Sequence, residues 1–412
     1  MNRSDSERIA TRLQEMGHKP AKNTASANLI VVNLCSVRES AVHRALDQIY
    51  KLNNKTRKII AAGCILPSDR KKLAAKNIAV WHPDDYFSQN PLRESKFSAF
   101  VPIMTGCNNF CSYCAVPYTR GREKSRPAKE IVAEIKKLLK NGIKEIILLG
   151  QNVNSYRAER DTNSSSEALA KADGFINFPR LLELINGLPG DFRLSFITSH
   201  PKDMSDKLIE AMAKCKKIIP YLHLPVQSGD DKILRAMNRH YSVAHYKNLI
   251  KKIHSSFARH RRVSKDKLLF SPLAISTDII VGFPGETAGQ FKNTLKLIKD
   301  IDFDMIYFAR YSPRSGTLAA KLKDNVSPKE KRRRAQAINT LLKKQALELN
   351  KKYIGQEVEI LVEKVDENWA RGKTTTNKEV QIPRKKLKIG QIVSAKITDA
   401  AAWHLKGLEK PR

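Results

Sequence analysis

The sequence predicts an α/β protein with three folded parts in succession along the chain. Strand-like apolar runs alternate with helical stretches up to about residue 320, and from Gly355 onward the apolar residues follow a period of two. Alternation of strand and helix favours parallel sheets, whereas a period of two favours a small antiparallel barrel. A chain of 412 residues is long enough for two or three such domains.

Residues 1–92 are expected to contain an open parallel sheet of flavodoxin-like type. A helix opens this segment, and two apolar runs follow it, "NLIVVNLC" and "KIIAAGC", which end at Cys35 and Cys64. Because the C-terminal ends of strands line the ligand crevice of an open α/β sheet, the two thiols are expected to face each other at one edge. The alternative is that both cysteines are structural, since free cysteine packs as a small apolar residue.

Residues 98–325 repeat a strand and a helix about six times, which favours a partial (β/α)6 barrel. The expected strands are, in chain order, "FVPIM", "EIILLG", "RLSFIT", "YLHLPV", "AISTDIIVG" and "MIYFARY". In such a barrel the chemistry takes place at the C-terminal ends of the strands. The loop after the first strand holds three of the six cysteines of the chain, so it is the first candidate site.

A basic helix over residues 326–351 is expected to connect this barrel to the last domain, with Ser327 and Glu330 as its capping box. Residues 352–412 are then expected to form a small antiparallel β-barrel of OB-like type, a fold that often binds single-stranded or looped nucleic acid. A solvated basic surface on a structural domain is the alternative. The basic residues expected to contact RNA are Lys364, Arg371, Lys373, Arg384, Lys385, Lys386 and Lys388.

The overall composition favours a polyanionic partner. Lys and Arg number 75 against 41 Asp and Glu, a net charge of +34, so nucleic acid is the first candidate and a merely basic, soluble surface is the alternative. The sequence has no apolar run long enough for a transmembrane helix, and its polar start lacks a signal peptide, so we expect a cytoplasmic protein. Six cysteines in so long a chain favour metal ligation over a disulfide framework.

The stretch "GCNNFCSYC" places Cys107, Cys111 and Cys114 within eight residues. Structural zinc needs four closed positions, usually from pairs of closely spaced ligands, and only Cys111 and Cys114 form such a pair. A 4Fe-4S cluster held by three thiolates leaves one iron open for a substrate, as a catalytic metal site requires. The spacing and the predicted context therefore favour a cluster over zinc or structural thiols.

Three cysteines in this pattern, with an aromatic residue before the last, resemble the radical S-adenosylmethionine (radical SAM) superfamily. Within that superfamily, "VPYTRG" and "GQNVN" are similar to the methylthiotransferases that modify isopentenylated adenosine in tRNA. The resemblance covers nearly the whole chain and extends to "NLCSVRESA", "AAGC" and a C-terminal TRAM-like barrel. The motifs that carry it are "CSYCAVPYTRGREKSRP", "LLGQNVNSY", "TSHPKDMSDKLI", "LHLPVQSGDDKILRAMNRHY", "STDIIVGFPGET" and "YSPRSGTLAA".

The resemblance implies that Cys107, Cys111 and Cys114 hold the radical SAM cluster and that Tyr113 lies beside the adenine of S-adenosylmethionine. Residues at the strand ends are implied to contact the cofactor, or the ribose or substrate. The alternative is that these polar residues only satisfy backbone groups. The residues concerned are Gly150, Gln151, Gln227, Ser228, Gly229, Thr277 and Asp278.

A second, auxiliary 4Fe-4S cluster in the N-terminal domain is also implied, with Cys35 and Cys64 among its three ligands. One S-adenosylmethionine would supply a methyl group, and a second would generate the radical that takes hydrogen from C2 of adenosine 37. The implied partners are the tRNA anticodon stem-loop, an electron donor such as flavodoxin or ferredoxin, and a sulfur donor. The protein is expected to act as a monomer.

The N-terminal domain departs from the family pattern. The family's first auxiliary cysteine precedes a Met-Asn pair that corresponds here to Met1 and Asn2, and the first strand of the sheet lies before it as well. Either the true start codon lies upstream, which the presence of Cys35 and Cys64 favours, or the auxiliary site is impaired. For the chain as given we expect an intact radical SAM cluster but weak assembly of the auxiliary cluster.

Two other functions are considered. The substrate of a methylthiotransferase could instead be threonylcarbamoyladenosine or a ribosomal protein, although "GQNVN" and the basic C-terminal barrel argue against both. The chain could also be a basic RNA-binding protein with vestigial activity, although the three clustered cysteines argue against this.

Overall fold

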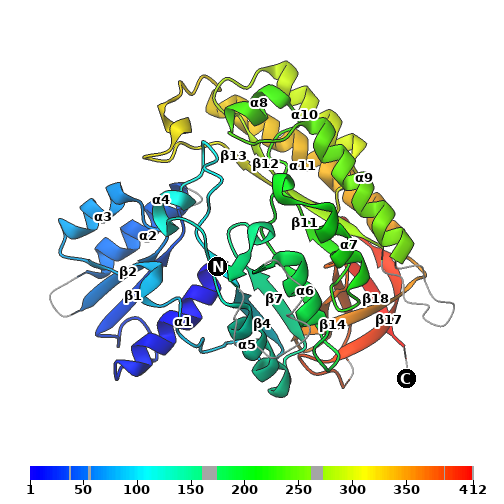
Figure 1. Ribbon diagram of the computed structural model, residues 1–412, viewed down its shortest axis with the longest axis horizontal. Helices are drawn as coiled ribbons and strands as arrows, with labels where there is room; N and C mark the ends of the chain where they lie inside the picture. Colours follow the sequence, from blue (N-terminus) through cyan, green and yellow to red (C-terminus); the bar gives the residue numbers. More distant parts are fainter. Residues whose placement is uncertain (37–38, 54–56, 160–173, 261–271, 385, 411–412) are drawn as a thin grey trace.

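The computed structural model describes residues 1–36, 39–53, 57–159, 174–260, 272–384 and 386–410. Its N-terminal domain and its C-terminal barrel lie on opposite sides of a central βα core (Figure 1). The expected α/β architecture and the strands predicted for it are confirmed. Among the described residues, none of the helices combines the length and the apolar character needed to cross a membrane.

The N-terminal domain has a parallel sheet with the order β1-β2-β3. Leu34 pairs with Gly63, so Cys35 and Cys64 directly follow the ends of neighbouring strands, as predicted. Leu46, Ile49 and Leu73 belong to the apolar core between this sheet and its helices. The elements are α1 (Asn2–Glu15), β1 (Leu29–Leu34), α2 (Glu39–Leu52), β2 (Lys58–Gly63), α3 (Pro67–Ala74), β3 (Ala79–Val80) and the 3-10 turn η1 (Pro83–Asp85).

The central core is an open barrel of six parallel strands. Two three-stranded sheets, β10-β7-β4 and β11-β12-β13, are joined by an isolated parallel bridge between Leu194 and Ile218. Because β4 and β13 do not pair, the barrel is partial, as predicted. The strands are β4 (Ser98–Pro102), β7 (Glu145–Leu149), β10 (Arg193–Phe196), β11 (Tyr221–His223), β12 (Ala274–Val281) and β13 (Met305–Arg310).

Helices follow the barrel strands. They are α5 (Ala128–Lys140), α6 (Phe178–Asn186), α7 (Asp206–Lys214), α8 (Asp231–Ala236), α9 (Val243–His260) and α10 (Ala288–Asp300). Shorter elements form the rims: β5 (Met104–Thr105), α4 (Val116–Arg120), β6 (Lys124–Ser125), η2 (Val153–Ser155), β8 (Arg157–Glu159), β9 (Phe175–Asn177), η4 (Pro201–Asp203) and η5 (Leu318–Lys321).

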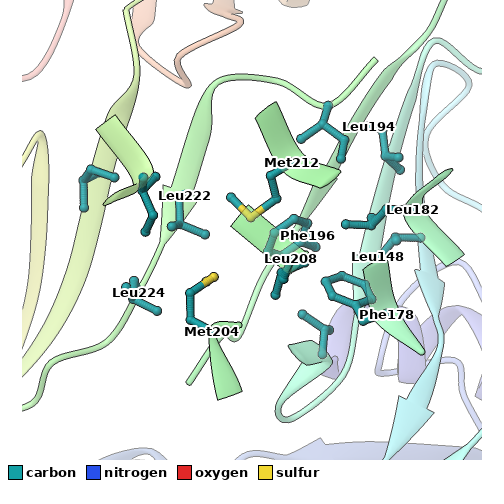
Figure 2. Close-up of a cluster of buried hydrophobic side chains, with 14 of the residues drawn as sticks. Leu148, Phe178, Leu182, Leu194, Phe196, Met204, Leu208, Met212, Leu222 and Leu224 are labelled. Atoms are coloured by element: carbon teal, nitrogen blue, oxygen red, sulfur yellow. The ribbon is translucent and has the colours of Figure 1, made fainter. Parts of the chain in front are cut away.

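Apolar side chains between the strands and the helices form the main hydrophobic core. Figure 2 shows part of it, where Phe178 of α6 meets Phe196 of β10 edge to face with ring centroids 5.0 Å apart. Met204 and Met212 lie beside them, and all four side chains are buried. Burial of each such side chain stabilises the fold by about 1.5–3 kcal/mol, so this core fixes the strands whose ends form the site.

The connecting helix α11 (Pro328–Lys351) packs Ile338, Leu342 and Ala346 into the same core. The Ser327 hydroxyl accepts a hydrogen bond from the backbone N–H of Glu330 at 3.2 Å, as a cap should. The Glu330 carboxylate pairs with Arg333 and Arg334 instead of returning to the cap, so the predicted capping box is only half formed.

The last five strands close into a barrel with the order β14-β15-β16-β18-β17. Val358, Ile360 and Val362 alternate into its interior, which confirms the predicted period of two, although the pair β16 and β18 is parallel. Arg193 of the core pairs with Glu359 of this barrel at 2.9 Å. The strands are β14 (Glu357–Val365), β15 (Trp369–Thr374), β16 (Glu379–Pro383), β17 (Ile392–Ala400) and β18 (Leu405–Glu409).

Candidate active site

The three-cysteine loop lies between β5 and α4, at the C-terminal end of the first barrel strand. Gly106 opens it with φ +79°, and a Cβ at this position would lie 1.9 Å from the carbonyl oxygen of Arg122. The backbone N–H of Cys107 donates to the carbonyl of Gly121 at 3.1 Å. The segment that follows α4 therefore packs directly against the three-cysteine loop. Only glycine fits at position 106, where the two segments touch.

Ser112, in the middle of this loop, forms hydrogen bonds with parts of the barrel that are distant in the sequence. Its backbone N–H donates to the carbonyl of Met237 at 3.0 Å, and its hydroxyl donates to the carbonyl of Ala236 at 2.8 Å. Its own carbonyl accepts from the N–H of Ala319 at 2.7 Å. The segment between the last two cysteines is thus held by the end of α8 and by η5, which gives the thiols fixed positions.

All three cysteines are free thiols, and Cys107 and Cys111 are buried. Burial, followed by the charge of Cys111, raises the pKa of Cys114 to about 12. Among the described residues, no three His, Cys, Asp or Glu side chains converge closely enough for a single metal ion. A cubane cluster fits this donor set, since each thiolate binds a different iron and the iron charge offsets the thiolate charges.

The mouth of the barrel beside this loop contains buried polar atoms that have no protein partner. Gln151, which follows β7, and Gln227, which lies shortly after β11, each have a buried side-chain carbonyl oxygen without a partner, and Gln227 adopts φ +69°. His200 has a buried Nε2 without a partner, while its Nδ1 accepts from the N–H of Lys202 at 3.2 Å. Because buried polar atoms are normally hydrogen-bonded, this mouth suits a polar ligand such as S-adenosylmethionine.

Two of the other residues expected to contact the cofactor, Gly150 and Thr277, are already engaged by the protein itself. Gly150 lies where a Cβ would come within 2.6 Å of Met104 Cγ, so this strand end needs glycine for packing. The hydroxyl of Thr277, which is fully buried, donates to the carbonyl of Leu224 and accepts from the N–H of Val226, both at 2.9 Å. The structure thus uses Thr277 to hold the segment after β11 against β12.

Ser228 and Gly229 are likewise engaged by the protein. The Ser228 hydroxyl accepts from the N–H of Asp230 at 3.3 Å, and the N–H of Gly229 donates to the Thr294 hydroxyl at 3.0 Å. Asp278 is different, because its carboxylate is partly exposed and lies 3.5 Å from Nε2 of His223. Asp278 therefore remains able to contact a ligand in the barrel.

Tyr113, which separates Cys111 from Cys114, is half-buried against the apolar cluster of Met237, Phe283 and Tyr311. Burial holds the pKa of the Tyr113 phenol well above its ordinary value, so the ring is neutral. Its flat apolar face next to the thiols suits the expected contact with an adenine ring.

The second cysteine pair lies where the N-terminal domain meets the core. Cys64 Sγ accepts a hydrogen bond from Nε of Arg120 at 3.0 Å, and the same guanidinium forms a buried ion pair with Asp5. Burial alone would lower the pKa of Arg120, but the charges of Cys64 and Asp5 raise it. The described part of the chain brings two thiols, Cys35 and Cys64, to this place and no third one.

Comparison with known proteins places these features in a family. The description "Radical SAM superfamily" matches residues 101–298, "Uncharacterized protein family UPF0004" matches residues 1–82, and "TRAM domain" matches residues 351–408. The chain is 38% identical to the tRNA-2-methylthio-N(6)-dimethylallyladenosine synthase of Thermoanaerobacter sp. (strain X514), over 99% of this chain and 90% of the relative. The synthase of that name from Carboxydothermus hydrogenoformans is also 38% identical, over 99% and 96%.

The chain belongs to the radical SAM tRNA-2-methylthio-N(6)-dimethylallyladenosine synthase family. A solved structure agrees on the fold: the radical SAM methyltransferase TsrM from Kitasatospora setae, with cobalamin and a [4Fe-4S] cluster, superposes with a TM-score of 0.51 at 12% identity. That superposition covers 77% of this chain and 69% of TsrM. Membership of the radical SAM family indicates one 4Fe-4S cluster and S-adenosylmethionine as cofactors.

In this methylthiotransferase the C-terminal barrel presents its basic residues to solvent with few strong partners. Arg371 lies 3.7 Å from Asp366, Lys373 lies 3.6 Å from Glu363, and Arg384 donates to the Asp366 carbonyl. Exposed pairs of this kind contribute little to stability, so these cations are available to phosphates. Lys364, Lys386 and Lys388 are exposed as well, whereas Lys385 lies outside the described residues.

Several residues at the methylthiotransferase site were not anticipated from the sequence. Arg239, which follows α8, donates to Cys111 Sγ at 3.4 Å, and His200 contributes the unpartnered ring nitrogen at the mouth. Asn152 of the "GQNVN" motif is buried and donates to Asp203 at 2.7 Å. The only sequence signal was their position inside "MNRHY", "TSHP" and "GQNVN", which resemble family motifs without stating what each residue contacts.

Proposed function

We propose that this protein converts N6-isopentenyladenosine 37 of tRNA to its 2-methylthio derivative. The observation that carries the proposal is the identity to named synthases over nearly the whole chain, combined with three fixed thiols at the mouth of the barrel. Threonylcarbamoyladenosine and ribosomal-protein substrates are the alternatives that the experiment below separates.

Each part of the chain has a proposed task. Cys107, Cys111 and Cys114 hold the radical SAM cluster, which, when bound with S-adenosylmethionine, supplies one-electron cleavage of that cofactor. Gln151 and Gln227 orient the cofactor through their unpartnered oxygens. We infer that the basic face of the C-terminal barrel holds the anticodon stem-loop through its phosphates.

The sulfur-inserting step is assigned to the N-terminal domain. We infer that Cys35 and Cys64 contribute to an auxiliary 4Fe-4S site, which would receive sulfur from a separate donor. Because two thiols are described there, we expect this chain to hold about four irons, those of one cubane, rather than eight. An electron donor such as flavodoxin or ferredoxin is proposed to supply the reducing electrons to the monomeric protein in the cytoplasm.

The proposal is tested by anaerobic reconstitution of the protein and incubation with S-adenosylmethionine, dithionite, sulfide and tRNA from a strain that lacks the modification. Because the auxiliary site of this chain is expected to assemble weakly, nucleoside mass spectrometry should find only a low level of 2-methylthio-N6-isopentenyladenosine, and Cys111→Ala should abolish it. Cys215→Ala is the matched control, because Cys215 is buried in the apolar core away from the site. A 2-methylthio group on threonylcarbamoyladenosine instead would contradict the assigned substrate.

A further inference from the structure

The guanidinium of Arg239 is buried in direct contact with the three-cysteine loop. Arg239 is 6% exposed, and each of its nitrogens makes one contact. Nε donates to the Tyr241 hydroxyl at 2.9 Å, Nη2 donates to the Pro225 carbonyl at 2.9 Å, and Nη1 donates to Cys111 Sγ at 3.4 Å. The side chain is therefore held rigidly, with one edge directed at a cluster ligand.

Unlike Arg120, Arg193 and Arg334, which are also buried, Arg239 has no carboxylate partner in the part of the chain that the structure describes. Arg334 pairs with Glu286 at 2.6 Å, and Arg193 pairs with Glu359 at 2.9 Å. An isolated buried charge is costly, so a buried arginine without an acidic partner needs negative charge from another source.

The neighbours of Arg239 leave one group that can supply this charge. The Tyr241 hydroxyl donates to the Val226 carbonyl at 2.9 Å, so it carries its proton and is neutral. The sulfur of Cys111 is the remaining contact, and it becomes anionic when it binds iron as a thiolate. The arrangement around Arg239 is therefore electrically balanced when Cys111 is a cluster ligand.

We propose that Arg239 is the fixed counter-cation of the radical SAM cluster and a positioning residue that raises the reduction potential of that cluster. Reduction adds one electron, and hence one negative charge, beside a buried guanidinium in a region of low dielectric. Hydrogen bonds to the ligand sulfurs and local charge are the terms by which a protein sets the potential of an iron–sulfur cluster. The inference depends on the cluster and not on the RNA, so it stands or fails separately from the proposed substrate.

The test compares Arg239→Gln and Arg239→Lys with the parent protein. Each protein is reconstituted anaerobically, its iron is counted, and its midpoint potential is measured by a dithionite titration followed by electron paramagnetic resonance, without tRNA or S-adenosylmethionine. Loss of a charge-assisted hydrogen bond should lower the equilibrium constant for reduction about tenfold in Arg239→Gln, which is about 59 mV for one electron. Arg239→Lys keeps the cation and should remain closer to the parent.

Arg235→Gln serves as the matched control, because Arg235 lies on α8, just before Arg239 in the chain, but is exposed, and it should leave the potential unchanged. If Arg239→Gln cannot hold the cluster whereas Arg239→Lys can, the need for a cation is supported. A full iron content with the parent potential in Arg239→Gln would overturn the proposal. Failure of both variants to hold iron would also overturn it, since the arginine would then be needed for its shape rather than its charge.

Discussion

The buried contact between Arg120 and Asp5 predicts how firmly the N-terminal domain is attached to the core. The side chains are 1% and 0% exposed, and they join α4 of the core to α1 across 115 residues of sequence. Arg120→Gln would leave the Asp5 carboxylate buried without its cation. Breaking one side of such a pair costs about 3–5 kcal/mol, so we expect the free energy of local opening of α1 to fall by about that amount in this variant.

Hydrogen exchange of the α1 amides measures this free energy directly, because local opening exposes them without global unfolding. Lys124→Gln is the control at the same domain boundary: Lys124 lies 3.4 Å from Asp84, but both are more than half exposed, so its loss should cost at most about 1 kcal/mol. Asp5→Asn added to Arg120→Gln should restore part of the protection by removing the uncompensated charge. If Arg120→Gln exchanges within about 0.5 kcal/mol of the parent, the ion pair does not hold the domain.

Three further predictions concern the site and the RNA surface. Gly106→Ala should prevent iron binding because its Cβ would overlap the Arg122 carbonyl. Gly121→Ala carries the same kind of backbone strain, at φ +73°, but its Cβ would meet no atom within 4 Å, so it should retain more iron in an iron assay. Burial lowers the pKa of His200 to about 2, so below about pH 6.5 the unfolded state binds a proton at this position and the folded state does not. The contribution of the neutral imidazole to the free energy of unfolding is therefore complete above that pH and is lost as the pH falls below it. Denaturation from about pH 8 to 5 should show a weaker decline in the free energy of unfolding for His200→Asn than for the parent. Arg384→Gln should weaken tRNA binding at every salt concentration and reduce the salt slope by about one, and an unchanged slope would exclude a phosphate contact.

The sequence was most informative where a contact is local. The Cys107–Cys114 loop and the strands before Cys35 and Cys64 were predicted because their spacing and their apolar runs are visible within a few residues. Such features depend on backbone preference and periodicity, which a short window of sequence contains.

Contacts between distant residues could not be predicted in this way. Arg239 reaches Cys111 from 128 positions away, and Arg120 reaches Cys64 from 56 positions away. The sequence also did not show on which face of the sheet the Thr277 side chain lies. Most of β12 is buried, and a strand that is covered on both faces shows no alternation of apolar and polar residues. For this reason the sequence could not tell that the hydroxyl of Thr277 binds the backbone of the neighbouring strand.

One short segment links the two cysteine sites of the protein. Cys114 ends the radical SAM loop, α4 follows as a single helical turn, and Arg120 at its end binds Cys64 of the N-terminal domain. In Figure 1, α4 lies against the N-terminal domain although it belongs to the core. Because a helical turn is stiff and Arg120 is buried, the separation between the two sites is set by local geometry and not by the mobility of whole domains. Any change that releases Arg120 should therefore alter the placement of Cys64 relative to Cys114 without altering the three-cysteine loop itself.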